Sequence, residues 1–185
     1  MNQELTFVAP EGLPRKMTLA EFMAHDIEGY EYVKGELVPM SPPTMEHGEI
    51  SVSIIRYLDW HVHENQLGRV YTAETTFQIG ERALKPDIAF VSTARLPENR
   101  KQGSPIPPDL AVEVVSPTDR QARVSEKVQA YLDAGTRMVW VIDAGLQTVA
   151  VYRQNKDFKL LTDEDTLTGE DVVEGFSCQV ARLFE

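Results

Sequence analysis

Two carboxylates and a lysine have the types and surroundings that chemistry on a phosphate would need. Asp87 follows Pro86 at the head of one apolar run, Glu113 lies inside a second, and Lys127 lies on the helix-like segment after it. Two hard oxygen ligands suit Mg²⁺, which can activate water, and a lysine adds a fixed positive charge beside that water. If the fold brings the three together, they form a site for metal-dependent cleavage of a phosphodiester.

The two acids differ in how strongly their surroundings favour a site. Pro86 cannot donate to a sheet, so Asp87 should lie at a strand end or sheet rim, where a solvated turn acid is the alternative. Glu113 interrupts the run Leu-Ala-Val-Glu-Val-Val, and a carboxylate in a buried strand is costly unless it is paired or binds a metal. For Glu113 the alternatives are a core ion pair and an edge position facing solvent.

Lys127 lies on the border of the apolar stripe of its predicted helix, one helical step from Val124 and from Tyr131. Its long side chain could reach back over the sheet to the carboxylates. The alternative is a lysine that extends into solvent at the helix edge.

The pattern of apolar residues predicts an α/β domain with a mixed central sheet. Helices are expected over residues 17–26, 45–66 (with Gly68 as the stop) and from 116–119 to about 134. A hairpin is expected at 30–40, and strands at 69–79, 88–92, 110–115 and 138–142, followed by a C-terminal meander of 148–152, 158–161 and 176–183. The order strand 110–115, helix, strand 138–142 predicts a crossover between parallel strands, with helices on both faces of the sheet.

Composition narrows the function classes. The length fits one domain over residues 1–185, with 1–16 as an N-terminal extension, and no stretch is apolar enough to span a membrane. The single cysteine, Cys178, excludes an internal disulfide and a Cys-rich zinc site, which suits a cytoplasmic protein. No Gly-rich phosphate loop or Gly-x-Ser-x-Gly elbow is present. The net charge of −11 disfavours tight nucleic-acid binding without excluding a small basic face.

Several motifs together resemble a known family. They are Pro86-Asp87, the run from Asp109 to Asp119, Lys127 with Tyr131, and Val-Trp-Val-Ile-Asp at 139–143. In this combination, with Gly35-Glu36-Leu37 and His47 upstream, residues 18–185 resemble the Uma2 family of PD-(D/E)XK nucleases, which implies the restriction-endonuclease-like fold.

The resemblance also implies roles. Asp87 and Glu113 would ligate Mg²⁺ (or Mn²⁺) with the backbone carbonyl of Val114, and Lys127 would orient the attacking water or stabilise developing charge. The superfamily's usual Glu-x-Lys would place lysine at position 115, where this chain has Val115, so Lys127 on the next helix is its match. Possible auxiliary residues are Glu36, His47 and Tyr131, of which His47 is also explained as a polar residue at a helix start and Tyr131 as a packing residue.

Three functions remain open on this basis. The first is a Mg²⁺-dependent endonuclease acting on DNA, with a homodimer expected by analogy. The second is a nuclease-fold module that binds or regulates without cleaving, which the charge and the displaced lysine favour. The third is a metal-dependent enzyme acting on a small phosphate ester, which would tolerate an acidic surface better.

Overall fold

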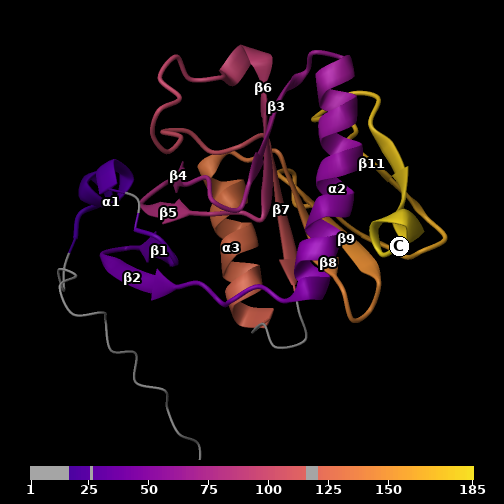
Figure 1. Ribbon diagram of the computed structural model, residues 1–185, viewed down its shortest axis with the longest axis horizontal. Helices are drawn as coiled ribbons and strands as arrows, with labels where there is room; N and C mark the ends of the chain where they lie inside the picture. Colours follow the sequence, from indigo (N-terminus) through magenta and orange to yellow (C-terminus); the bar gives the residue numbers. More distant parts are fainter. Residues whose placement is uncertain (1–16, 26, 116–120) are drawn as a thin grey trace, which may run out of the picture.

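The computed structural model describes residues 17–25, 27–115 and 121–185, so the predicted N-terminal extension and the predicted start of the third helix lie outside the described residues. The helices are α1 (Leu19–His25), α2 (Met45–Glu64) and α3 (Gln121–Ala134), with 3₁₀ helices η1 (Thr93–Arg95) and η2 (Val180–Leu183) (Figure 1). The strands are β1 (Tyr30–Val33), β2 (Glu36–Pro39), β3 (Gly68–Thr72), β4 (Phe77–Ile79), β5 (Arg82–Leu84), β6 (Ile88–Ser92), β7 (Leu110–Val115), β8 (Met138–Asp143), β9 (Thr148–Arg153), β10 (Phe158–Leu161), β11 (Thr166–Thr168) and β12 (Ser177–Gln179). The three predicted helices and the predicted hairpin are therefore confirmed within the described ranges.

A six-stranded mixed sheet organises the fold, with the strand order β10-β9-β8-β7-β6-β3. β7 and β8 are parallel and are joined through α3, which confirms the predicted crossover. The other four pairings in this sheet are antiparallel. The predicted mixed α/β architecture is thus confirmed.

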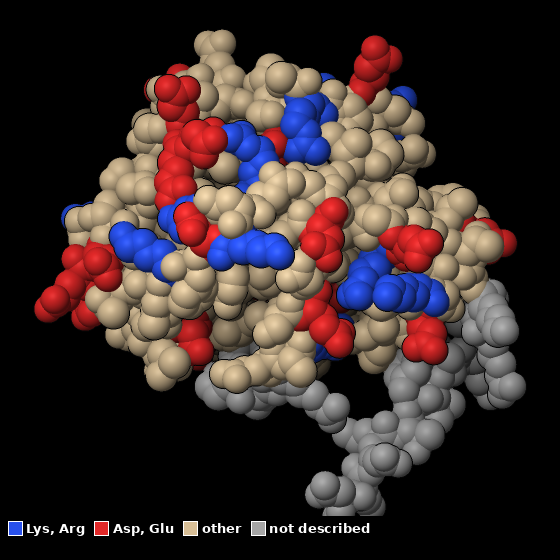
Figure 2. Space-filling view, turned by 180° about the vertical axis from the view of Figure 1, so that it is seen from behind, with Lys and Arg blue, Asp and Glu red and all other residues tan. Residues whose placement is uncertain are grey.

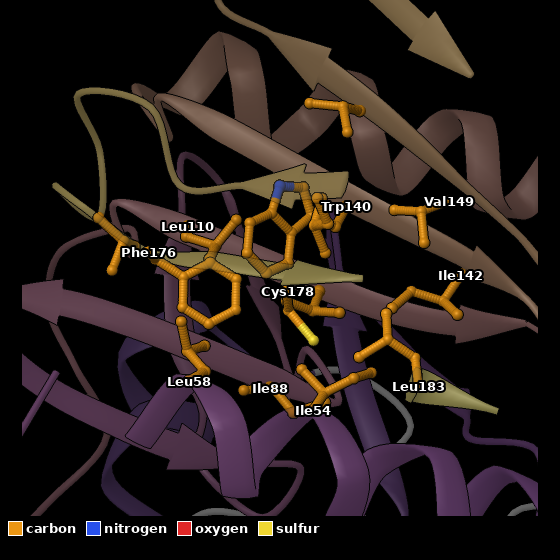
Figure 3. Packing of buried hydrophobic residues seen from close by; sticks show 14 of the residues in the cluster. Ile54, Leu58, Ile88, Leu110, Trp140, Ile142, Val149, Phe176, Cys178 and Leu183 are labelled. Atoms are coloured by element: carbon orange, nitrogen blue, oxygen red, sulfur yellow. The ribbon is translucent and has the colours of Figure 1, made fainter. Parts of the chain in front are cut away.

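Helices cover both faces of this sheet. On one face, α2 and the C-terminal segments pack with alternate residues of β6, β7 and β8, around the fully buried Trp140, whose ring lies 5.6 Å from that of Phe176 (Figure 3). On the other face, Val128 and Tyr131 of α3 pack with the intervening residues, among them Ala111 and Val139. Burial on both faces explains why these strands are almost continuously apolar in sequence. Glu113 takes one of the positions that face α3.

A smaller four-stranded sheet, in the order β2-β1-β5-β4, lies against the α3 side of the molecule. It is covered by α1, where Phe22 packs on Tyr32 and Ala83. The predicted capping box begins α1: Glu21 donates its backbone N–H to Thr18 Oγ1 at 3.2 Å, and Thr18 donates its own to Glu21 Oε2 at 2.7 Å. This sheet brings β1 to the end of the central sheet where the predicted site residues lie.

Two boundaries differ from the sequence prediction. Residues 69–79 do not form one strand, because the chain turns after Thr72 and its second part, β4, joins the smaller sheet. Their alternation fitted a single strand because each part has one covered face. In the C-terminal region, β8, β9 and β10 form the antiparallel meander, whereas residues 176–183 contain only the short β12, which pairs with β11, followed by η2.

Gly68 has a different role from the predicted helix stop. Helix α2 ends at Glu64, and Gly68 is instead the first residue of β3. A Cβ at this position would lie 2.1 Å from the carbonyl oxygen of Val91 and 2.8 Å from the ring of Phe90. The glycine allows β3 and β6 to approach closely.

Gly68→Ala should therefore lower the free energy of unfolding by about 1–3 kcal/mol or more, because backbone must move to admit the methyl group. Gly48→Ala is the matched control, since a Cβ there meets nothing within 4 Å and the residue lies inside α2. That control should raise stability by about 0.5–1 kcal/mol. Urea denaturation measures the free energy of unfolding of both variants. Equal effects of the two substitutions would contradict the packing explanation.

No helix within residues 17–25, 27–115 and 121–185 has the length and apolar character that crossing a membrane requires. The cytoplasmic location stays a prediction.

Candidate active site

A cleft of about 510 Å³ opens where β6 begins and β7 ends, between the first turn of α2, the first half of α3 and the smaller sheet. Asp87, Glu113, Val114 and Lys127 all line it, and so does His47. The structure therefore brings together the three residues singled out in the sequence. Glu36 is the exception: it lies exposed at the start of β2 and is not among the residues that line the cleft.

Asp87 is positioned by the pairing of β6 with β7. Ile88 lies opposite Val112 in this antiparallel pair, so the residue before β6 comes level with Glu113. Asp87 Oδ2 accepts a hydrogen bond of 2.7 Å from the backbone N–H of Val114, which holds the carboxylate against the end of β7. Asp87 lies at a sheet rim, as expected of an acid after proline.

Glu113 is held by two residues of α3. It is only 8% exposed, its Oε1 accepts a hydrogen bond of 2.7 Å from the hydroxyl of Tyr131, and the ammonium of Lys127 lies 2.8 Å from each carboxylate oxygen. Positions 127 and 131 are one helical turn apart, so both side chains reach the same carboxylate. Lys127 thus points over the sheet and not into solvent, and Tyr131 buttresses the pair.

Burial and neighbouring charges shift the proton affinities of this cluster. Burial raises the pKa of Glu113 to about 7, against the attraction of Lys127, and Asp87 and Glu31 add to the rise. Burial alone would lower the pKa of Lys127, but the carboxylates of Glu113 and Glu31 outweigh it and raise that pKa above its usual range. Burial beside the same acids raises the pKa of Tyr131 well above its usual value. Lys127 and Tyr131 are therefore protonated donors at neutral pH.

A third carboxylate, Glu31, completes the cluster and was not among the residues predicted from the sequence. It lies in β1, is 2% exposed, and its Oε1 is 3.0 Å from Lys127 Nζ and accepts the backbone N–H of Lys85 at 3.1 Å. Its Oε2 lies 3.4 Å from Arg123. An acid between Tyr30 and Tyr32 in a strand was the available signal, but the sequence did not show that both faces of β1 are covered.

His47 lies in the first turn of α2, where its backbone N–H donates to the N-cap Thr44 at 3.2 Å. Its imidazole Nε2 lies 3.1 Å from Asp87 Oδ2. His47 is thus the polar helix-start residue that was one alternative, and its side chain also contacts Asp87, whereas its auxiliary role in the site stays a prediction.

Comparison with known proteins assigns the chain to a family. The sequence profile of the Uma2 family, described as "Putative restriction endonuclease", matches residues 17–181, which is most of the chain. The chain belongs to the Uma2 family.

Solved structures show the same fold. A crystal structure of "a putative nuclease belonging to DUF820" from Anabaena variabilis ATCC 29413 superposes with a TM-score of 0.81 at 24% identity, over 91% of this chain and 97% of that one. The Uma2 chain has the restriction-endonuclease-like fold. An electron cryomicroscopy structure of a DrdV–DNA complex is a distant match, with a TM-score of 0.38 and 13% identity over 71% of this chain and 11% of that one. No curated protein matches the chain.

The carboxylate oxygens that line the cleft are of the chemical type that Mg²⁺ prefers as ligands. Within the described residues, no group of three or more His, Cys, Asp and Glu side chains is arranged as a metal site. Mg²⁺ does not need such a cage, because it usually binds through one or two carboxylates, with waters and substrate phosphate completing the octahedron. Asp87 Oδ1 accepts no hydrogen bond from the described residues, and Glu113 Oε2 accepts one, from Lys127. Both acids therefore keep oxygen lone pairs for a cation, whereas the Val114 carbonyl as a ligand stays a prediction.

Proposed function

We propose that this Uma2 protein is a Mg²⁺-dependent endonuclease that hydrolyses DNA phosphodiester bonds. One observation carries the proposal: a protonated lysine lies 2.8 Å from a buried glutamate in an open cleft, with a second carboxylate at the neighbouring strand end. This set of groups suits a reaction in which a phosphate gains negative charge.

The side chains of the cleft have the following roles in this proposal. Asp87 and Glu113 would hold Mg²⁺ (or Mn²⁺), which supplies a water of lowered pKa and neutralises phosphate charge. Lys127 keeps its proton and so stabilises developing charge, or orients the water, without acting as a base. Tyr131 donates to Glu113 and fixes its orientation, and His47 orients Asp87.

The position of the Lys127 ammonium supports this proposal. Val115 stands where the superfamily has lysine, two residues after Glu113 in β7. The ammonium of Lys127 nevertheless reaches Glu113 from α3. A flexible four-carbon stem delivers the same charge from a neighbouring element.

A binding module that does not cleave is the second candidate, and two observations favour it. The net charge is −11, and the face drawn in Figure 2 mixes acidic with basic side chains instead of presenting a broad basic surface. In addition, Lys127 and Tyr131 already donate to Glu113. A phosphoesterase acting on small substrates would also tolerate this surface.

Plasmid cleavage separates the candidates. With Mg²⁺ or Mn²⁺, wild-type protein should nick supercoiled plasmid, and Asp87→Ala should slow nicking by about two orders of magnitude. Asp59→Ala is the matched control, since it removes an exposed acid of α2 outside the cleft and changes the net charge equally. If wild type and both variants are equally inert over a range of salt, the binding module is the better proposal.

The homodimer also stays a prediction. Cutting both strands of a duplex at one place needs two active sites, which a pair of chains would supply.

A further inference from the structure

Arg123 is a second cation that α3 presents to the cleft. It lies one helical turn before Lys127, lines the same cleft, and keeps 38% of its side chain exposed. Residues four apart on a helix have Cβ atoms about 5–6 Å apart, so the two cations lie side by side. None of the roles proposed above uses Arg123.

The guanidinium of Arg123 is held in place by oxygen atoms of β1 and β2 in the smaller sheet. Its two terminal nitrogens each donate to the carbonyl oxygen of Pro39 at 3.2 Å, and one of them lies 3.4 Å from Glu31 Oε2. Glu31 is itself buried and fixed by Lys85 and Lys127. A guanidinium clamped in this way loses little freedom when it binds an anion.

Arg123 also has donors to spare. Guanidinium carries five N–H groups, and three contacts to described residues leave two of them without a protein partner in the described part of the chain. The ammonium of Lys127, by contrast, is already shared between Glu31 and Glu113. Arg123 therefore keeps N–H donors with which it can bind a substrate oxyanion in the cleft.

We propose that Arg123 binds the phosphate adjacent to the one that is cleaved, so that the cleft selects a polynucleotide strand over a small phosphate ester. The proposal rests on the endonuclease function proposed above and adds its substrate class. Two cations one helical turn apart match consecutive phosphates of one strand, whereas a small diester offers only one. The competing explanation is structural, namely that Arg123 only ties the β1–β2 hairpin to α3.

Kinetics on two substrates distinguish these explanations. Arg123→Ala should raise KM for a DNA oligonucleotide about tenfold, the loss of one charge-assisted contact, and should affect hydrolysis of bis(p-nitrophenyl) phosphate at least fivefold less. Arg123→Lys should recover part of the loss. Arg137→Ala is the matched control, because Arg137 is 40% exposed and paired with Asp171 but does not line the cleft. Equal losses on both substrates would show a structural role and overturn the proposal.

A binding measurement makes the outcome independent of catalysis. Fluorescence anisotropy with an end-labelled single-stranded oligonucleotide, without divalent ions and at about 50 mM salt, should show weaker binding by Arg123→Ala than by wild type or Arg137→Ala. If wild type does not cleave but this difference appears, the endonuclease function fails and the phosphate contact stands. If all three proteins bind equally, or none binds, the phosphate contact is overturned, whatever plasmid cleavage shows.

Discussion

Replacing Lys127 by methionine should lower the rate of DNA cleavage by about two to three orders of magnitude, the typical loss when one charge-stabilising donor is removed. Methionine keeps much of the length and apolar character of the side chain but removes the ammonium that lies 2.8 Å from Glu113 and 3.0 Å from Glu31. The initial rate of plasmid nicking in Mg²⁺ measures the loss. Lys159→Met controls for the lost charge, since Lys159 is an exposed residue of β10.

Lys127→Met should also destabilise the fold, so loss of cleavage has to be separated from loss of stability. Glu31 is 2% and Glu113 8% exposed, and breaking a buried pair from one side typically costs about 3–5 kcal/mol. The double variant Lys127→Met with Glu31→Gln removes one charge of each sign and should recover part of the stability without recovering cleavage. Recovery of cleavage in the double variant would contradict a direct role of Lys127.

Glu113 should make the stability of the protein fall as the pH rises from about 5 to 8. Its pKa is raised from an ordinary 4.5 to about 7, so in this window the folded protein holds a proton that the unfolded chain has released. The unfolded state binds fewer protons, and stability therefore declines with rising pH, by up to about 3 kcal/mol from this group. Glu113→Gln cannot ionise and should lose this decline. Urea denaturation at four pH values, without divalent ions, measures the difference between the two proteins.

Glu170→Gln is the control for this pH dependence. The hydrogen bond from Arg153 lowers the pKa of Glu170, so its contribution to stability is lost only as the pH falls below the ordinary range of a carboxyl group. Between pH 5 and 8 the difference between Glu170→Gln and wild type should stay flat. Added Mg²⁺ at pH 8 should stabilise wild type more than Glu113→Gln, because the cation favours the ionised acid. If the difference in stability between Glu113→Gln and wild type also stays constant from pH 5 to 8, burial does not raise the pKa of Glu113.

Local sequence patterns sufficed for much of the fold. The capping box at Thr18, the turn at Lys34-Gly35 and the apolar runs of β6, β7 and β8 predicted elements that the structure contains. These signals act within one element or between neighbours, where propensity and periodicity decide the outcome. Gly68 was misinterpreted because its reason lies in another strand: the carbonyl of Val91 leaves no room for a Cβ.

Residue types and local patterns were enough to identify residues that could do chemistry. Asp87 after proline, Glu113 inside an apolar strand and Lys127 at the edge of a helical stripe are visible without coordinates. Together with the surrounding motifs they resemble the Uma2 family, which the profile match over residues 17–181 confirms. Which other side chains join them depends on contacts between distant segments. Glu31 replaces Glu36 in the cluster because the smaller sheet places β1 against α3, and such a long-range contact leaves no periodic trace in the chain. A buried charge is stable only beside suitable partners, and packing between distant segments determines which partners lie beside it.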